Sequence, residues 1–322
     1  MVVVTYPKEC EVVQPAPPRG RAATPLFLLH DGGGTTFAYH CLSPLDRAVF
    51  GIANPRFTSG TEWPGGVPEM ARAYLRMIRN TVAGAEYPPM APCTLTKEGR
   101  RRWKILLGGW SLGGLLSLEI ARLLVTGKNE GGVDEGALAG GGGDEVEIVG
   151  LVMIDSVYPV WPVGSEVKIG TWIETEVPEH KNLKLARRAM KLAGGMVKVW
   201  KMPRCGAAFR NGVDYEADED GEKGVEKSFY GSRAEKETAE VVWDRPPRGV
   251  LVRASDCVPM PGDGISPVDV YRGDAKLGWD GYCPGYVEKT FVTKGNHFDM
   301  FAWGYVDEIT ERVAEACRYL EG

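Results

Sequence analysis

The sequence predicts an α/β fold: a mostly parallel central sheet flanked by helices, with a helical lid insertion. Short apolar runs bounded by glycine recur along the chain, and such runs are typical of buried strands. Segments with apolar residues at helical spacing alternate with these runs, which favours a parallel sheet. The chain has 322 residues, enough for one α/β domain with an inserted subdomain.

The first strand is expected at 26–29, where Leu-Phe-Leu-Leu runs into a glycine-rich loop. The residues before it, 1–24, are Pro-rich toward their end and are expected to form an extended lead-in. A helix is expected at 68–82, because apolar residues recur there at helical spacing and Pro68 suits a first turn. The other expected strands are 48–53, 103–109, 146–154, 250–254 and 287–293, and the other expected helices are 112–125 and 299–320.

Two segments interrupt this alternation. Residues 127–147 hold eight glycines in 21 positions, so we expect a flexible glycine-rich insertion there. Residues 158–245 are too long for a loop in a compact domain, so we expect them to carry their own helices as a lid subdomain. The core domain would then comprise residues 1–157 and 246–322.

Composition and charge exclude several classes of protein. The 38 basic and 43 acidic residues give a net charge of −5, so no overall positive field favours nucleic acid. No apolar run is long enough for a transmembrane helix, so no membrane partner is expected, and the N-terminus lacks a signal-peptide pattern. The seven cysteines are scattered and odd in number, so we expect reduced thiols, a cytoplasmic location and no metal site.

The strongest chemical motif is Gly109-Trp110-Ser111-Leu112-Gly113, which fits the G-x-S-x-G pattern between an expected strand and an expected helix. On such a sharp turn the nucleophile adopts strained backbone angles, and the flanking glycines let backbone segments approach closely. Ser111 is therefore the expected nucleophile. The Leu112 N–H, at a helix N-terminus, is an expected oxyanion donor. The alternative is an ordinary serine N-cap.

His297 is the expected base among four histidines, because it lies between the last strand and the last helix. The chain order nucleophile, acid, base is that of α/β-hydrolases. Two carboxylates are candidates to orient its imidazole: Asp155 follows the strand at 146–154, and Asp256 follows the strand at 250–254. Both lie at the carboxyl edge of the sheet, where sites form in open α/β sheets, and spacing alone leaves the choice open.

The loop at 30–36 is expected to complete the site. Its glycines, Gly32 and Gly33 among them, remove side chains where a substrate carbonyl must approach, and one of their N–H groups would be the second oxyanion donor. The loop does not fit a phosphate-binding motif, because the Walker A lysine is absent. The residues expected to line the site are His30, Asp31 and Trp110.

Four blocks of the sequence resemble the thioesterase domains of polyketide synthases and nonribosomal peptide synthetases, especially fungal ones. The blocks are 25–34, 108–114, 151–156 and 295–300. The resemblance is weak across 157–245 and absent in the glycine-rich insertion. It implies the α/β-hydrolase fold, and it implies Asp155 as the acid, because the family carries its acid after the strand that follows the nucleophile helix. The interval of 44 residues from Ser111 to Asp155 is longer than usual, and the insertion accounts for the excess.

The same resemblance implies the reaction. An acyl chain arrives as a thioester on the phosphopantetheine arm of an acyl or peptidyl carrier protein, and Ser111 takes it as an acyl-serine. Water then gives hydrolysis, and an internal hydroxyl, amine or carbon nucleophile gives cyclisation; no cofactor is required. Because the sequence starts at Met1 and holds no carrier domain, we expect an enzyme that acts in trans.

Alternatives remain open at this stage. A carboxylesterase or lipase, or an acyltransferase to a separate acceptor, would use the same three residues, and a catalytically dead binding module is the least favoured interpretation. The segment at 180–200 is basic and could dock an acidic carrier protein or form an ordinary solvated face. Its basic residues are Lys181, Lys184, Arg187, Arg188, Lys191 and Lys198.

Overall fold

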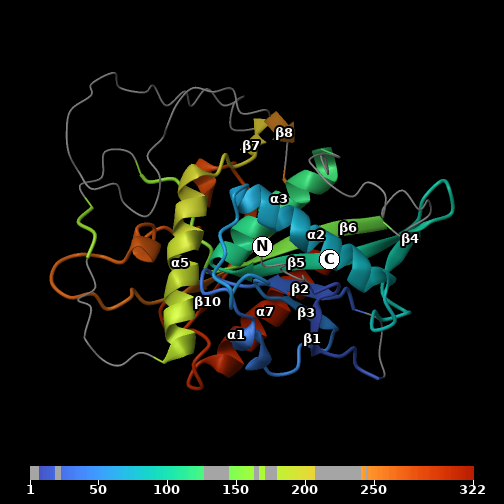
Figure 1. Ribbon diagram of the computed structural model, residues 1–322, viewed down its shortest axis with the longest axis horizontal. Helices are drawn as coiled ribbons and strands as arrows, with labels where there is room; N and C mark the ends of the chain where they lie inside the picture. The colour runs from blue at the N-terminus through green and yellow to red at the C-terminus, as the bar shows by residue number, and fades with distance from the viewer. Residues whose placement is uncertain are drawn as a thin grey trace.

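The computed structural model describes residues 7–18, 23–126, 145–162, 167–170, 180–206, 241–243 and 246–322. Its central sheet has the strand order β1-β3-β2-β5-β6-β9-β10, with β4 paired to β5 (Figure 1). All neighbours along this order run parallel except β1, which is antiparallel to β3, and β4 is antiparallel to β5. The strands are β1 (Glu11–Gln14), β2 (Leu26–Leu29), β3 (Val49–Ile52), β4 (Cys93–Leu95), β5 (Arg101–Trp110), β6 (Glu145–Ile154), β9 (Gly249–Ala254) and β10 (Val287–Thr293).

The expected strands are confirmed, with shifts of one or two residues at several ends. β2 is apolar throughout because both of its faces are buried. Leu26 and Leu28 enter one buried cluster, and Phe27 and Leu29 enter the other. Two short strands, β1 and β4, and the helical turn α1 (Phe37–His40) were not expected. β1 was assigned to the extended lead-in, because its four half-exposed residues are too few to show an alternating pattern.

Helices cover both faces of the sheet (Figure 1). α2 (Gly66–Ala83) and α3 (Leu112–Thr126) pack together on one face, and α7 (Val306–Glu321) lies against β6, β9 and β10 on the other. The last helix was expected from residue 299 but begins at 306. The reason is a turn: the Asp299 carboxylate accepts hydrogen bonds from the backbone and side-chain nitrogens of Asn296, at 2.6 and 2.8 Å.

The described part of the predicted lid contains one long helix, α5 (Lys181–Val199), which stands beside the sheet in yellow (Figure 1). It packs against α2 and buries Ala189, Ala193 and Gly194. Two short strands, β7 (Arg204–Cys205) and β8 (Val241–Trp243), pair in a separate sheet. The limits of the lid stay a prediction. Of the glycine-rich insertion, residues 127–144 lie outside the described residues, and 145–147 begin β6. No helix in the described ranges is long and apolar enough to span a membrane.

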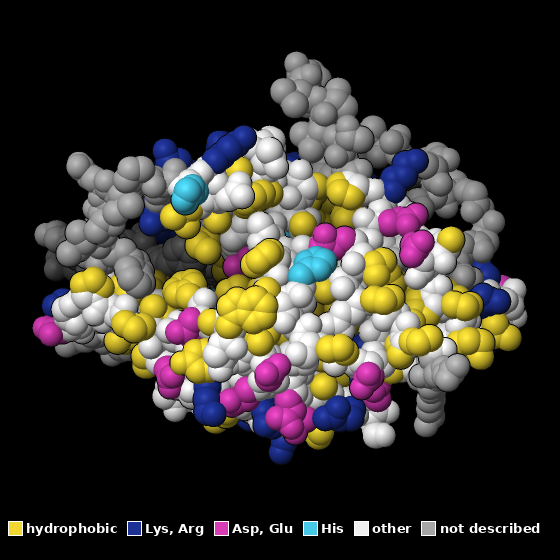
Figure 2. All heavy atoms as spheres, turned by 90° about the horizontal axis from the view of Figure 1, so that it is seen from below, with side chains coloured by type: hydrophobic (Ala, Val, Ile, Leu, Met, Phe, Trp, Pro, Cys, Tyr) yellow, Lys and Arg dark blue, Asp and Glu magenta, His cyan; other side chains and the backbone are white. Residues whose placement is uncertain are grey.

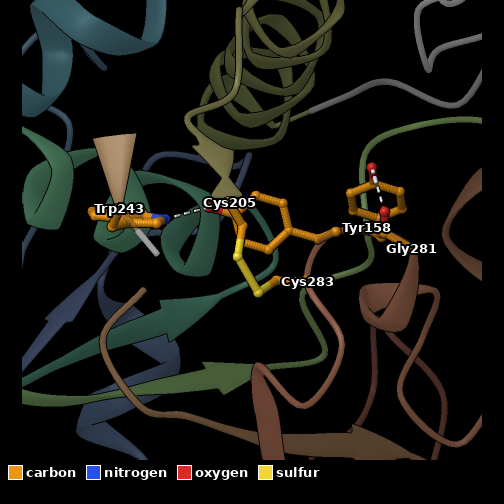
Figure 3. Close-up of a disulfide and its surroundings, with 6 residues drawn as sticks. Tyr158, Cys205, Trp243, Gly281 and Cys283 are labelled. Atoms are coloured by element: carbon orange, nitrogen blue, oxygen red, sulfur yellow. Dashed lines mark hydrogen bonds between the residues drawn. A yellow bond between two sulfur atoms is a disulfide. The ribbon is translucent and has the colours of Figure 1, made fainter. Parts of the chain in front are cut away.

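A disulfide joins β7, which lies in the predicted lid, to the segment before β10, and this corrects the expectation that all thiols are reduced. Cys205 in β7 is bonded to Cys283, 78 residues later, in the segment that leads to β10 (Figure 3). Beside the bond lies Trp243, labelled in Figure 3, and its indole N–H donates to the Tyr282 hydroxyl at 3.1 Å. Cysteine spacing could not indicate this pair, because the fold brings distant segments together. Two 3-10 turns, η1 (Pro267–Asp269) and η2 (Trp279–Gly281), lie in the segment between β9 and β10.

Candidate active site

Ser111 lies on the sharp turn between β5 and α3, at the carboxyl edge of the sheet. Its φ is +55°, a left-handed conformation that is uncommon for residues other than glycine. The turn is possible because its neighbours are small. A Cβ on Gly109 or on Gly113 would lie 2.4 Å from the Leu29 carbonyl oxygen, so both glycines are needed for the turn to close against β2.

Two side chains that the motifs did not indicate brace this turn. Ser156 Oγ donates to the Ser111 carbonyl oxygen at 2.7 Å. The Tyr39 hydroxyl accepts from the Trp110 N–H at 2.8 Å and donates to the Leu29 carbonyl oxygen at 2.5 Å. Both side chains are buried. A tyrosine in an unpredicted helical turn and a serine after a strand carry no sequence signal of such a role.

His297 follows β10 and contacts both neighbours expected of it. Its Nε2 lies 3.1 Å from Ser111 Oγ, and its Nδ1 lies 2.7 Å from Asp155 Oδ2. A carboxylate only accepts hydrogen bonds, so Nδ1 carries a proton and, in the neutral ring, Nε2 accepts from the Ser111 hydroxyl. The imidazole is 3% exposed, and the Trp110 ring lies beside it with centroids 5.7 Å apart. The structure thus brings together three residues from three parts of the chain.

Asp155 follows directly after β6 and is fully buried. Its carboxylate accepts hydrogen bonds from the Ala254 N–H at 2.9 Å, from His297, and from both terminal nitrogens of Arg272 at 2.7 Å. Burial alone would raise the pKa of Asp155, but the hydrogen bonds from Arg272 and His297 hold it well below its usual range. Asp155 is therefore an anion across the physiological range.

Asp256, the other acid candidate, points elsewhere. Its side chain is exposed and accepts from Ser255 Oγ at 2.8 Å, and its backbone N–H donates to the Gly295 carbonyl oxygen. The His297 Nδ1–H donates to Asp155 instead. The parallel pairing of β5 with β6 puts the end of β6 next to the end of β5, and of the two candidates Asp155 is the one that His297 contacts.

The loop after β2 contains a buried histidine. His30 Nε2 lies 2.6 Å from the Tyr74 hydroxyl, and Nδ1 lies 2.5 Å from the Asp31 carbonyl oxygen. Burial lowers the pKa of His30 to about 4, although the hydrogen bond to the Asp31 carbonyl opposes this shift. His30 is therefore neutral at physiological pH and supports the loop.

The neighbouring Asp31 carboxyl has a pKa above its usual value. Burial raises the pKa of Asp31 to about 6, while His297 and the backbone N–H groups of Gly33 and Gly34 lower it. Asp31 is therefore a second carboxyl group that interacts electrostatically with His297.

A cavity separates this loop from α5. It is lined by His30, Gly32 and Leu112 on the core side and by α5 on the other, and a Cβ on Gly32 would meet Met190 at 3.7 Å. Leu112 is the first residue of α3, so its N–H is at the helix N-terminus as expected. The described residues contain no group of acidic, histidine or cysteine side chains that could hold a metal ion. The lining of α5 in this cavity is Ala189, Leu192, Ala193 and Met196.

The outer surface near the site has both apolar and charged side chains. Phe37, Phe298 and Trp303 lie in segments that adjoin the site in sequence, and all three are exposed, Trp303 to 87%. Figure 2 shows one face of the molecule, with hydrophobic side chains gathered near its middle and charged ones along its lower edge. Apolar surface of this kind is common where a partner or ligand binds.

A serine on a strand-to-helix turn, bonded to a histidine and through it to an aspartate above a parallel sheet, is the arrangement of the α/β-hydrolase fold. No family model matches the chain. Curated relatives do: thioesterase frbD of Dothideomycetidae sp. (strain 11243) is 32% identical over 94% of this chain and 92% of its own length. Probable thioesterase lcsE of Purpureocillium lilacinum is 30% identical over 94% and 90%. The chain belongs to the thioesterase family of fungal polyketide and nonribosomal peptide biosynthesis.

Two further comparisons extend this result. The nonribosomal peptide synthetase imqB of Aspergillus flavus is 29% identical over 91% of this chain, which corresponds to 8% of the synthetase. Among solved structures, the Vlm2 thioesterase domain with a bound dodecadepsipeptide has a TM-score of 0.50 at 13% identity, covering 97% of this chain and 99% of that one. At this identity the structural likeness concerns the fold, which agrees with the α/β-hydrolase architecture described above.

Proposed function

We propose that the chain is a serine thioesterase in which Ser111 is the nucleophile, His297 the general base and Asp155 the acid that orients the imidazole. The observation that supports this proposal is the continuous hydrogen-bond chain from Ser111 Oγ through His297 to Asp155 Oδ2. A base within hydrogen-bond distance of a serine, itself held by a buried carboxylate, is the geometry that nucleophilic catalysis requires.

The chemistry proceeds in two steps. Ser111 Oγ bonds to the thioester carbon while its proton passes to His297 Nε2; the carbon–sulfur bond then breaks, and His297 returns the proton to the departing thiolate. In the second step an acceptor loses its proton to His297 and attacks the acyl carbon; the bond to Ser111 Oγ then breaks, and His297 returns the proton to Oγ. The N–H groups of Leu112 and of Gly32 or Gly33 would hold the oxyanion. The chemistry requires no cofactor.

The substrate we propose is a polyketide or peptidyl chain on the phosphopantetheine thioester of a carrier protein that acts in trans. One relative is a part of the nonribosomal peptide synthetase imqB, which supports a synthase partner. α5 supports a protein partner because residues 180–206 contain eight Lys or Arg residues and no Asp or Glu, so an acidic carrier would be attracted. Six of these side chains are exposed on α5, namely Lys181, Lys184, Arg187, Arg188, Lys191 and Lys198.

The first experiment is intact-protein mass spectrometry after treatment with a fluorophosphonate probe. We expect one adduct on the wild type and none on Ser111→Ala. Turnover of an acyl-N-acetylcysteamine thioester should disappear in a Ser111→Ala protein that remains folded. Turnover by that folded variant would refute the mechanism, and faster hydrolysis of an oxygen ester than of the matched thioester would favour a carboxylesterase. Product analysis with and without a small-molecule acceptor separates hydrolysis from acyl transfer.

The carrier contact has its own test. Octanoyl acyl carrier protein and octanoyl-N-acetylcysteamine present the same acyl group with and without a protein partner. We expect Lys184→Glu/Lys191→Glu to lower kcat/KM about tenfold for the carrier substrate and to leave the small thioester unchanged. Lys97→Glu, an exposed lysine in the turn after β4, is the matched control. Equal effects on both substrates would refute docking on α5.

A further inference from the structure

Arg272 binds both oxygens of the Asp155 carboxylate, and it shares Oδ2 with His297. Its two terminal nitrogens bind the two carboxylate oxygens at 2.7 Å each, and one of them also donates to the Ala254 carbonyl oxygen at 3.0 Å. Arg272 and Asp155 are 6% and 0% exposed. A bidentate pair of this geometry fixes the plane of the carboxylate, and that plane sets the direction of the hydrogen bond to His297 Nδ1.

Arg272 is itself held by a second carboxylate. Its Nε donates to Asp269 Oδ1 at 2.9 Å, and Asp269 Oδ2 accepts from the Val258 N–H at 2.7 Å. Burial alone would lower the pKa of Arg272, but Asp155 and Asp269 raise it, so the guanidinium is charged. The guanidinium therefore cannot rotate away from Asp155 without losing its bond to Asp269.

The four groups form a line of alternating charge. With His297 neutral, Asp155, Arg272 and Asp269 carry a net charge of −1 in a buried region. When His297 accepts the serine proton, the line becomes electrically neutral. The other charged groups around it are Arg253, which donates to the carbonyl oxygens of Arg272 and Asp274, and Asp31, whose carboxyl interacts with His297.

We propose that Arg272 is a positioning residue of the reaction: with Asp269 behind it, it locks the Asp155 carboxylate against His297 and balances the charge of the buried site. This proposal rests on the proposed function of Ser111, His297 and Asp155. It adds that the segment after β9, where Asp256 was considered as the acid, contributes the cation that holds the acid.

The test compares Arg272→Met and Arg272→Lys with matched variants of Arg47. Arg47 is similarly buried, at 5% exposed, and makes the same two-nitrogen contact, to Glu321 at 3.0 and 3.2 Å, but it lies away from the site. For Arg272→Met we expect kcat to fall about 100-fold more than for Arg47→Met, with KM within about twofold of wild type. Without the guanidinium, the Asp155 and Asp269 carboxylates are no longer neutralised and favour the His297 imidazolium. The acid limb of kcat/KM should therefore move up by about one pH unit.

Arg272→Lys keeps the charge but not the fork. We expect Arg272→Lys to lower kcat about tenfold and to leave the acid limb of kcat/KM unmoved. If Arg272→Met does not fold, the comparison of Arg272→Lys with Arg47→Lys replaces it. Equal losses in the Arg272 and Arg47 variants with an unmoved acid limb would overturn the proposal, as would wild-type kcat in folded Arg272→Lys. An inert wild type that also fails to react with the fluorophosphonate would instead refute the proposed function.

Discussion

Ser111 and Asp155 directly follow two neighbouring parallel strands, and both have a positive φ, 55° and 42° respectively. Their backbones are linked, because the Ser111 N–H donates to the carbonyl oxygen of Ile154, the residue before Asp155. Two residues other than glycine are thus held side by side in the left-handed region. Strain of this kind persists only where the surrounding structure holds it, as the turn contacts do here.

Substitution of each acid candidate by asparagine should have unequal effects on kcat. Asp155→Asn keeps the size of the side chain but removes the charge that holds the Nδ1–H tautomer, so kcat should fall about 10⁴-fold. Asp256→Asn alters only an exposed hydrogen bond to Ser255 and should leave kcat within about twofold. Steady-state kinetics on a thioester checks both variants, and a larger loss in Asp256→Asn would reassign the acid.

Gly109→Ala should destabilise the protein. The new Cβ would lie 2.4 Å from the Leu29 carbonyl oxygen and 2.8 Å from Gly113 Cα, so β2 or α3 would have to shift. Overpacking of a close backbone contact costs about 1–3 kcal/mol or more. The control is Gly304→Ala, where no atom lies within 4 Å of the added Cβ. Urea unfolding measures the difference, and equal midpoints for the two variants would contradict the packing described here.

His30 should make the fold sensitive to acid. Its pKa is about 4 when folded and about 6.5 when unfolded, so the unfolded chain binds more protons between these values. Its contribution is present above about pH 6.5 and is lost as the pH falls toward 4, by up to roughly 3 kcal/mol. His30→Gln should flatten this loss in urea unfolding at pH 7.5 and pH 5.

Asp31 provides the opposite control for that experiment. Its folded pKa, raised to about 6, means that the folded chain binds more protons below pH 6, which stabilises the fold as the pH falls. Asp31→Asn should therefore steepen the acid loss that His30→Gln flattens. Parallel pH dependences in the two variants would contradict the environments assigned to both residues.

The disulfide predicts a count of free thiols. Cys205 and Cys283 are bonded, and Cys10, Cys41, Cys93, Cys257 and Cys317 are free. Alkylation in denaturant without reductant should therefore add five labels, and seven after reduction. Seven labels before reduction would show that the pair is not bonded in the isolated protein. Peptide mapping of the unreduced protein should recover the fragments around residues 205 and 283 as one linked species.

The amino-acid sequence by itself determined the alternation of strands and helices, the serine turn and the histidine before the last helix. These features are local: a buried strand needs a few consecutive apolar residues, and the turn at Ser111 needs small residues at 109 and 113. The same reasoning missed β1, which is too short to show a pattern. It also started the last helix too early, because a hydrogen bond from Asn296 to Asp299 overrides helical spacing.

Only the tertiary structure decided which carboxylate serves His297 and what holds it. The His297–Asp155 and Arg272–Asp155 contacts join residues 142 and 117 positions apart, and the disulfide spans 78. Such pairs follow from the order in which strands assemble in the sheet, which spacing along the chain does not encode. Nothing in the residues around Arg272 marks it, because an arginine becomes part of a site only when folding buries it against a particular carboxylate.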